Sequence, residues 1–207
     1  MQIVLALFFI YMKKVFRIFI ISLLMIFVWP FFLYKKYGNK RYRLENRTII
    51  VANHYSTWDP FYIYMIYGGK KKITFITIKE AKKRFFAGFF TWLFDCIFID
   101  LESNHVLFIR QCMRVLKNDG ILCIFPEGYY NPRKYGFLDF KPSFVFLSTK
   151  AKANVLPLYI YPESTIFRRS KIYIGDVIPW EKLNEYDDFD CAAMYVQSKV
   201  MDYSFLV

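Results

Sequence analysis

The chain has 207 residues, of which 56% are hydrophobic and 22% aromatic, and its 29 Lys and Arg against 17 Asp and Glu give a net charge of +12. This apolar content excludes a disordered basic tail, and four Cys without a CxxC pair, with only two His, exclude a disulfide scaffold, a thiolate zinc cluster and most His-rich metal sites. The joint excess of charge and aromatic residues indicates a partner that is both anionic and apolar, which a phospholipid membrane satisfies better than nucleic acid does.

The apolar excess begins at the N-terminus. Residues 3–12 form one apolar run, and residues 18–33 form a second that is broken only by Ser22 and Pro30. Sixteen helical residues extend about 24 Å, short of the roughly 30 Å of a bilayer's hydrocarbon core. Because Lys and Arg flank the second run on both sides, we expect residues 1–40 to form two short helices of a monotopic membrane anchor. A single membrane span is the alternative, and a cleaved signal peptide fits less well because the start is not basic.

The pattern changes after this segment, and residues 41–207 are predicted to form one domain. The predicted strands are residues 48–52, 73–78, 96–100, 121–125, 155–161 and 171–174. The predicted helices are residues 60–67, 79–94, 106–116, 143–151 and 187–201. Such alternation is typical of an α/β fold, here a single domain with a largely parallel mixed sheet flanked by helices. The basic residues that follow the second apolar run, and the unpaired Cys, place this domain on the cytoplasmic face of the membrane.

A polar loop with the sequence NHYSTWD follows the first predicted strand of this domain, at residues 53–59. An imidazole titrates near neutral pH, so His54 can act as a general base, and Asp59 can hold its tautomer. On a straight helix the two would lie about 140° apart, so the chain must turn between them and Asp59 must lie near the start of the next helix. The alternative is that Asp59 only caps that helix and His54 is an ordinary loop residue.

A second polar motif, Phe125, Pro126, Glu127 and Gly128, ends the strand predicted at residues 121–125. Proline cannot continue a central strand, and glycine permits a positive φ or a close approach of the backbone. Glu127 is therefore predicted at a strand end, where it can meet a ligand. The alternative is an ordinary acidic turn.

Together the two motifs resemble those of the glycerophospholipid acyltransferase family, of which lysophosphatidate acyltransferases are typical. That family has a His and an Asp separated by four residues, with Phe-Pro-Glu-Gly downstream. Residues 98–100 (FID) and 155–158 (VLPL) are similar to two further family blocks, in the expected order. The resemblance extends from about residue 48 to residue 174, and a pair of N-terminal membrane helices is also typical of the family.

The resemblance implies transfer of a fatty acyl group from acyl-CoA or acyl-carrier protein to a lysophospholipid hydroxyl, most simply that of 1-acylglycerol-3-phosphate, to give phosphatidate. His54 is then the base on that hydroxyl and Asp59 its partner, without a covalent acyl-enzyme. Asn53 and the four residues of the Phe-Pro-Glu-Gly motif are expected in the substrate site. Neither a metal nor a cofactor is expected. Alternatives are another lysophospholipid or glycerol phosphate as acceptor, a non-catalytic lipid-binding protein on the same fold, and a nucleic-acid binder.

Several positions depart from the family pattern, and two of them are positions of arginine. Leu101 and Tyr130 stand where the family usually has Arg. Those arginines are expected to bind the acceptor phosphate, because a guanidinium makes bidentate contacts with it. The candidate replacements, at displaced positions, are Arg133, Lys134 and Lys141.

Overall fold

The computed structural model describes residues 33–68, 71–80, 85–94, 96–99, 106–129, 131, 136–162 and 169–206, together with isolated residues between 5 and 23. A seven-stranded sheet has the order β1-β7-β6-β2-β5-β3-β4. Its strands are β1 (Tyr34–Gly38), β2 (Thr48–Ala52), β3 (Ile73–Ile78), β4 (Cys96–Ile99), β5 (Ile121–Ile124), β6 (Asn154–Ile160) and β7 (Ser170–Ile174). Only β6 and β7 pair antiparallel among these strands, so the predicted α/β domain with a largely parallel sheet is confirmed.

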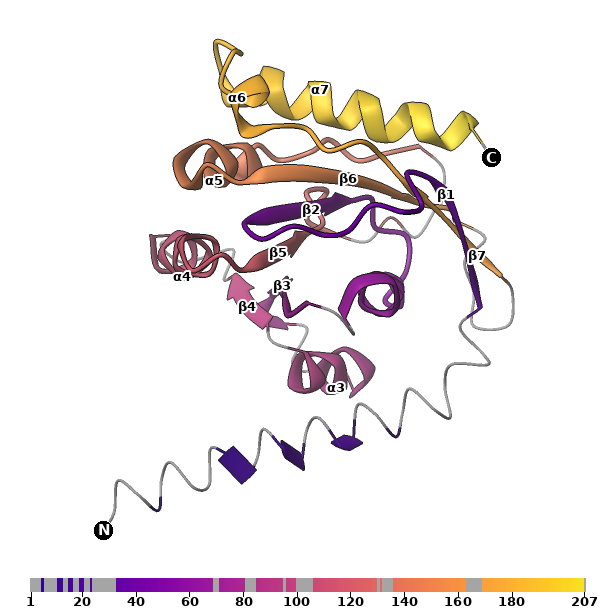
Figure 1. The fold of residues 1–207 in the computed structure, drawn as a ribbon, viewed down its shortest axis with the longest axis vertical. Coiled ribbons are helices and arrows are strands. Elements are labelled where there is room, and N and C mark those ends of the chain that lie inside the picture. Colours follow the sequence, from indigo (N-terminus) through magenta and orange to yellow (C-terminus); the bar gives the residue numbers. More distant parts are fainter. Residues whose placement is uncertain are drawn as a thin grey trace.

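Helices cover both faces of the sheet (Figure 1). The helical elements are α2 (Asp59–Ile63), η2 (Tyr64–Gly68), α3 (Phe85–Leu93), α4 (Val106–Lys117), α5 (Ser143–Ala151), α6 (Trp180–Leu183), α7 (Phe189–Asp202) and η4 (Tyr203–Phe205). In β2, Ile49 and Val51 pack toward α4, α5 and α7, while Ile50 and Ala52 pack toward α2 and α3. Every residue of β2 is buried, as expected of a parallel strand that is covered on both faces.

Most of the predicted helices agree with the structure to within a few residues. The helix expected at residues 60–67 is α2 continued by η2, a π-helix. The closing helix expected at residues 187–201 is α7, and the side chain of Asp188 caps it by accepting the Cys191 N–H at 2.6 Å. In the helix expected at residues 79–94, residues 81–84 lie outside the described residues, and α3 begins at Phe85.

Strand β1 was not predicted. Its residues lie within the segment assigned to the anchor, but they pair in parallel with β7, from Tyr34 opposite Ser170 to Gly38 opposite Ile174. The sequence YKKYG has no apolar alternation, which is the signal that marks a half-buried strand. Lysine is common on edge strands because it discourages pairing with other chains. The two lysines of β1 interrupt the apolar pattern, and the strand could not be predicted from it.

The predicted anchor falls mostly on residues outside the described part of the chain. Among the residues described there, Met12, Phe16, Phe19 and Leu23 are helical with exposed side chains. No helix within the described residues is long and apolar enough to cross a bilayer.

Candidate active site

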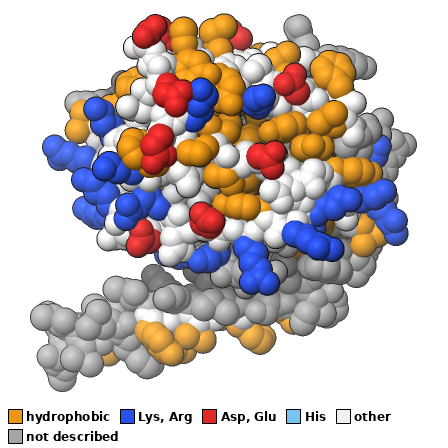
Figure 2. Space-filling view, turned by 45° about the horizontal axis from the view of Figure 1, so that its top comes forward, with side chains coloured by type: hydrophobic (Ala, Val, Ile, Leu, Met, Phe, Trp, Pro, Cys, Tyr) orange, Lys and Arg blue, Asp and Glu red, His pale blue; other side chains and the backbone are white. Residues whose placement is uncertain are grey.

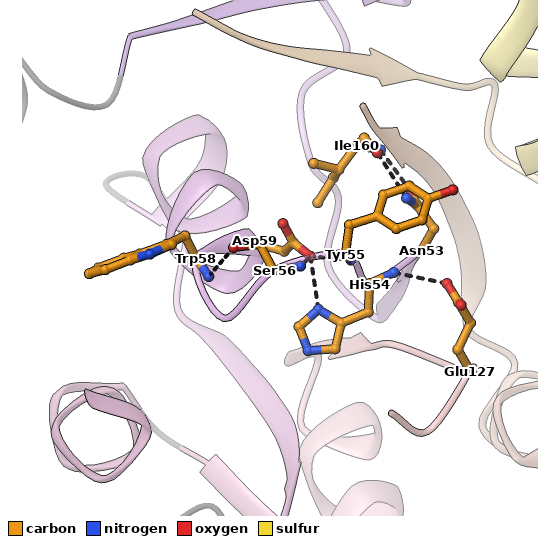
Figure 3. A network of polar contacts seen from close by, with 8 residues as sticks. All are labelled: Asn53, His54, Tyr55, Ser56, Trp58, Asp59, Glu127 and Ile160. Carbon is orange, nitrogen blue, oxygen red and sulfur yellow. Dashed lines mark hydrogen bonds and ion pairs between the residues drawn. The ribbon is translucent and has the colours of Figure 1, made fainter. Parts of the chain in front are cut away.

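The two predicted motifs meet at the carboxyl edge of the sheet (Figure 3). Strands β2 and β5 are parallel neighbours, so the loops that follow them leave the sheet at the same edge. The His54 ring, after β2, stacks on the Phe125 ring, after β5, with centroids 4.2 Å apart and an interplanar angle of 22°. Residues more than seventy positions apart in the chain therefore form one site.

The His54 and Asp59 side chains form a close pair. His54 Nδ1 lies 2.8 Å from Asp59 Oδ2, and the Asp59 side chain is fully buried. The same oxygen accepts the backbone N–H groups of Tyr55 at 2.7 Å and Ser56 at 2.8 Å. The chain turns between the two residues and Asp59 is the first residue of α2, as the spacing predicted. Asp59 thus orders the loop and orients the imidazole at once.

This geometry determines which imidazole nitrogen can accept a proton. A carboxylate is only an acceptor, so its contact with Nδ1 requires Nδ1 to carry the hydrogen. In the neutral ring Nε2 then holds the lone pair, and Figure 3 shows it on the side of the ring away from Asp59. The arrangement is that of a general base with an orienting carboxylate.

Glu127 binds the backbone of two loops. Its Oε1 accepts the His54 N–H at 2.9 Å, and its Oε2 accepts the Leu138 N–H at 3.1 Å. The residue is only 3% exposed, and burial raises the pKa of its carboxyl, while the two backbone hydrogen bonds oppose that rise. Both carboxylate oxygens are therefore engaged in holding the protein chain.

The loop after β5 also holds the other side of the His54 peptide. The Asn131 N–H donates to the His54 carbonyl oxygen at 2.7 Å. The Lys141 N–H donates to the Pro126 carbonyl oxygen at 3.0 Å, which closes the loop at its base. The backbone N–H and C=O of His54 are thus both bonded to one loop.

Asn53 determines where β2 leaves the sheet. Its fully buried amide donates to the Ile160 carbonyl oxygen at 2.8 Å and accepts the Ile160 N–H at 2.7 Å. The last residue of β2, Ala52, pairs with Leu158, so the Asn53 side chain takes the place of the next backbone pair along β6. The main chain can turn away at this point without leaving Ile160 unpaired.

A cavity of about 440 Å³ lies beside His54. Most of its wall is apolar and comes from β3, α3, α4 and β5, including Phe75, Ile76, Phe90, Phe94, Phe108 and Ile124. Tyr129 and Lys141 line the same cavity. Gly128 has a φ of +79°, and a Cβ there would lie 2.9 Å from Lys141 Nζ, so glycine lets the ammonium group approach the loop closely.

The remaining predicted site residues are not all within the described part of the chain. Arg133 and Lys134 lie outside it, as do Leu101 and Tyr130. The role of Asn131 was not predicted, because it acts through its main-chain N–H, for which no residue type is required. Within the described residues, no group of three or more His, Cys, Asp or Glu side chains is arranged to hold a metal ion.

Comparison with known proteins agrees with the motifs. The family model described as Acyltransferase matches residues 34–162. The chain is 29% identical over 128 residues to a probable 1-acyl-sn-glycerol-3-phosphate acyltransferase of Mycoplasma pneumoniae, a match that covers 56% of this chain and 45% of that protein. The crystal structure of the 1-acyl-sn-glycerophosphate (LPA) acyltransferase PlsC from Thermotoga maritima has a similar fold, with a TM-score of 0.63 at 22% identity over 84% of this chain and 71% of that one.

The raised pKa of Glu127 predicts a pH dependence of stability. The folded state keeps the Glu127 proton to a higher pH than the unfolded chain, whose carboxyl titrates near the ordinary value of 4.5. Below pH 4.5 the bound proton makes its full contribution to the free energy of unfolding. That contribution is lost as the pH rises through the raised pKa of Glu127 in the folded state. Wild type should therefore gain stability relative to Glu127→Gln as the pH falls toward 4.5, measured by denaturant unfolding across this range.

Glu45→Gln is the matched control for this experiment, because it removes a carboxyl group that is exposed. Its stability difference from wild type should not show the same dependence on pH. A pH-independent difference between wild type and Glu127→Gln would contradict the assignment.

Proposed function

The chain belongs to the acyltransferase family, and from this membership we propose that it transfers a fatty acyl group from a thioester donor to the free hydroxyl of a lysophospholipid. The single observation that carries the proposal is the His54–Asp59 pair, at 2.8 Å, beside a mostly apolar cavity. The proposed acceptor is 1-acylglycerol-3-phosphate, with phosphatidate as product, which the name of the Mycoplasma pneumoniae relative supports. The donor is acyl-CoA or acyl-carrier protein.

In the proposed mechanism His54 Nε2 takes the proton of the acceptor hydroxyl while that oxygen attacks the thioester carbonyl. Asp59 stabilises the imidazolium that forms. The tetrahedral intermediate then collapses to the ester, and the departing thiolate takes the proton from the imidazolium. General base catalysis of this kind supplies about 10²- to 10⁴-fold, and the thioester is already activated.

Cys123, which lies beside the Phe-Pro-Glu-Gly motif, does not suit a covalent acyl-enzyme. Cys123 is fully buried in β5, and burial raises the pKa of its thiol well above the ordinary value. A thiol without access to its thiolate is a poor nucleophile. We therefore propose direct attack by the acceptor hydroxyl, with His54 as base and no nucleophilic role for Cys123.

Asn53 and Glu127 act as positioning residues in this scheme, because their polar atoms bind the Ile160, His54 and Leu138 backbone. Phe125 supports one face of the His54 ring. Pro126 and Gly128 shape the loop, and Gly128 adjoins Lys141. The acyl chain would occupy the apolar part of the cavity.

Lys141 is the cation that we assign to the acceptor phosphate. It lines the cavity together with His54, and its ammonium lies 5.7 Å from the centroid of the Tyr129 ring. A phosphate held there would place an acceptor within the same cavity as the base. A single ammonium in place of two guanidinium groups makes this contact a point charge without bidentate geometry.

The proposed location is the cytoplasmic face of a phospholipid membrane, through a monotopic or single-span anchor. Phe89 and Trp92 of α3 are exposed, and so are Phe16 and Phe19. Ile20 packs against the core cluster that lies on the α3 side of the sheet. Apolar side chains of the N-terminal segment and of α3 therefore support one membrane-facing side.

The central experiment is an acyl transfer assay with labelled acyl-CoA or acyl-carrier protein and a panel of lysophospholipids and glycerol phosphate. His54→Ala should lower kcat/KM by about 10²- to 10⁴-fold while the protein stays folded. His105→Ala, which changes the other His of the chain, is the control and should retain activity. Full activity in His54→Ala would refute the assigned base, and no transfer by wild type with any acceptor would refute the proposed function.

A second experiment concerns the acceptor phosphate. Lys141→Ala should raise the KM for 1-acylglycerol-3-phosphate by about 10- to 100-fold, because a charge-assisted hydrogen bond contributes about 1.5–3 kcal/mol. The KM for acyl-CoA should stay within about twofold, and Lys141→Arg should retain most of the affinity. Lys199→Ala in α7 is the matched control. An unchanged acceptor KM in Lys141→Ala would exclude this lysine as the phosphate contact.

A further inference from the structure

Helix α4 has an exposed face that the proposed site does not use. Its buried side is Phe108, Cys112 and Leu116, which pack against the sheet. The outward side presents Leu107, Arg110, Arg114 and Lys117, which we call the α4 basic face. Leu107 is 65% exposed, and its neighbour Val106 is 50% exposed, so the first turn of α4 presents apolar side chains to solvent.

The cations of the α4 basic face are not neutralised by the described carboxylates. None of the three side chains forms an ion pair or hydrogen bond with the described part of the chain. The acidic residue that follows the helix, Asp119, is paired instead with Arg47 at 2.8 Å. Figure 2 shows several Lys and Arg side chains, with Asp and Glu among them, toward the left edge of the molecule, the side on which both α4 and α5 lie in Figure 1.

The α4 basic face begins close to the cavity that contains His54. Phe108, next to Leu107 in the chain, lines the cavity that contains His54. Leu107 thus lies on the outer surface of the helix whose inner surface forms the cavity wall. From Leu107 to Lys117 the α4 basic face extends about 15 Å along the helix axis, which is the rise of ten helical residues. Anything bound along α4 would have one end beside the cavity.

The shape and location of the α4 basic face restrict what can bind it. An exposed helix surface is convex, whereas small molecules bind in concave sites. Helix α3, with the exposed Phe89 and Trp92 that we assign to the membrane, packs on the other face of the sheet from α4. Arginine is enriched at protein–protein interfaces relative to the rest of the surface, so the exposed Arg110 and Arg114 suit a protein partner.

We propose that the α4 basic face docks an acidic acyl carrier protein, which delivers the acyl thioester into the His54 cavity from the α4 side. Acyl carrier proteins hold the acyl chain on a flexible phosphopantetheine arm, which in this proposal reaches the cavity that Phe108 of α4 lines. Arg110 and Arg114 supply charge complementarity, and Leu107 supplies an apolar contact. This inference rests on the proposed function and names the partner that brings its donor.

The test measures binding and turnover in parallel. Binding of palmitoyl-acyl carrier protein from the same organism to the full chain in detergent should weaken at least about tenfold in Arg110→Glu/Arg114→Glu, and the loss should shrink as salt is raised. The variant's kcat/KM should fall by a similar factor with this donor and stay within about twofold with palmitoyl-CoA. Arg110→Lys/Arg114→Lys should retain binding, and Leu107→Ser should weaken it.

Lys182→Glu/Lys199→Glu, which reverses two cations on α6 and α7, is the control and should bind the carrier like wild type. No binding by wild type, or equal binding by wild type and Arg110→Glu/Arg114→Glu, would overturn the inference. An equal loss of turnover with palmitoyl-CoA would also overturn it. Wild-type transfer from palmitoyl-CoA is a separate readout, and its absence counts against the proposed function, not against docking.

Discussion

The peptide of His54 is bonded on both sides to the loop that follows β5, through Glu127 at its N–H and Asn131 at its C=O. These two bonds fix the main chain from which the imidazole projects. Stacking on Phe125 and the bond to Asp59 then fix the ring itself. A general base is effective only when it is held within hydrogen-bond reach of the proton it removes, so the proposed chemistry depends on this restraint.

The sheet makes the restraint possible. Because β2 and β5 are parallel neighbours, one motif can bind the other without a long excursion of the chain. The Asn53 amide lets β2 end early while β6 continues to Ile160, so the buried N–H and C=O of Ile160 stay paired where the chain turns. The polar side chains of Asn53 and Glu127 and the Oδ2 atom of Asp59 are thus buried with specific partners, whereas Asp59 Oδ1 has no hydrogen-bond partner within the described part of the chain.

The central strands and the turn between His54 and Asp59 could be predicted from the sequence, because the types and spacing of the residues mark them. Buried runs such as residues 121–124 marked the central strands, and the His54–Asp59 spacing required the turn that the structure contains. Strand β1 was missed because an edge strand with two lysines has no apolar period. The contacts of Glu127 and Asn131 with His54 could not be predicted, because their partners are main-chain atoms that no residue pattern marks.

The most direct test of the site is to determine the tautomer of His54 by ¹⁵N NMR. The protein is labelled at its two histidines, and the His54 signals are assigned as those that His54→Ala lacks. If Asp59 orients the ring, the neutral imidazole must be protonated at Nδ1 and unprotonated at Nε2. Asp59→Asn should lose this preference. A neutral His54 with its hydrogen on Nε2 in the wild-type protein would contradict the assignment of Nε2 as the catalytic base.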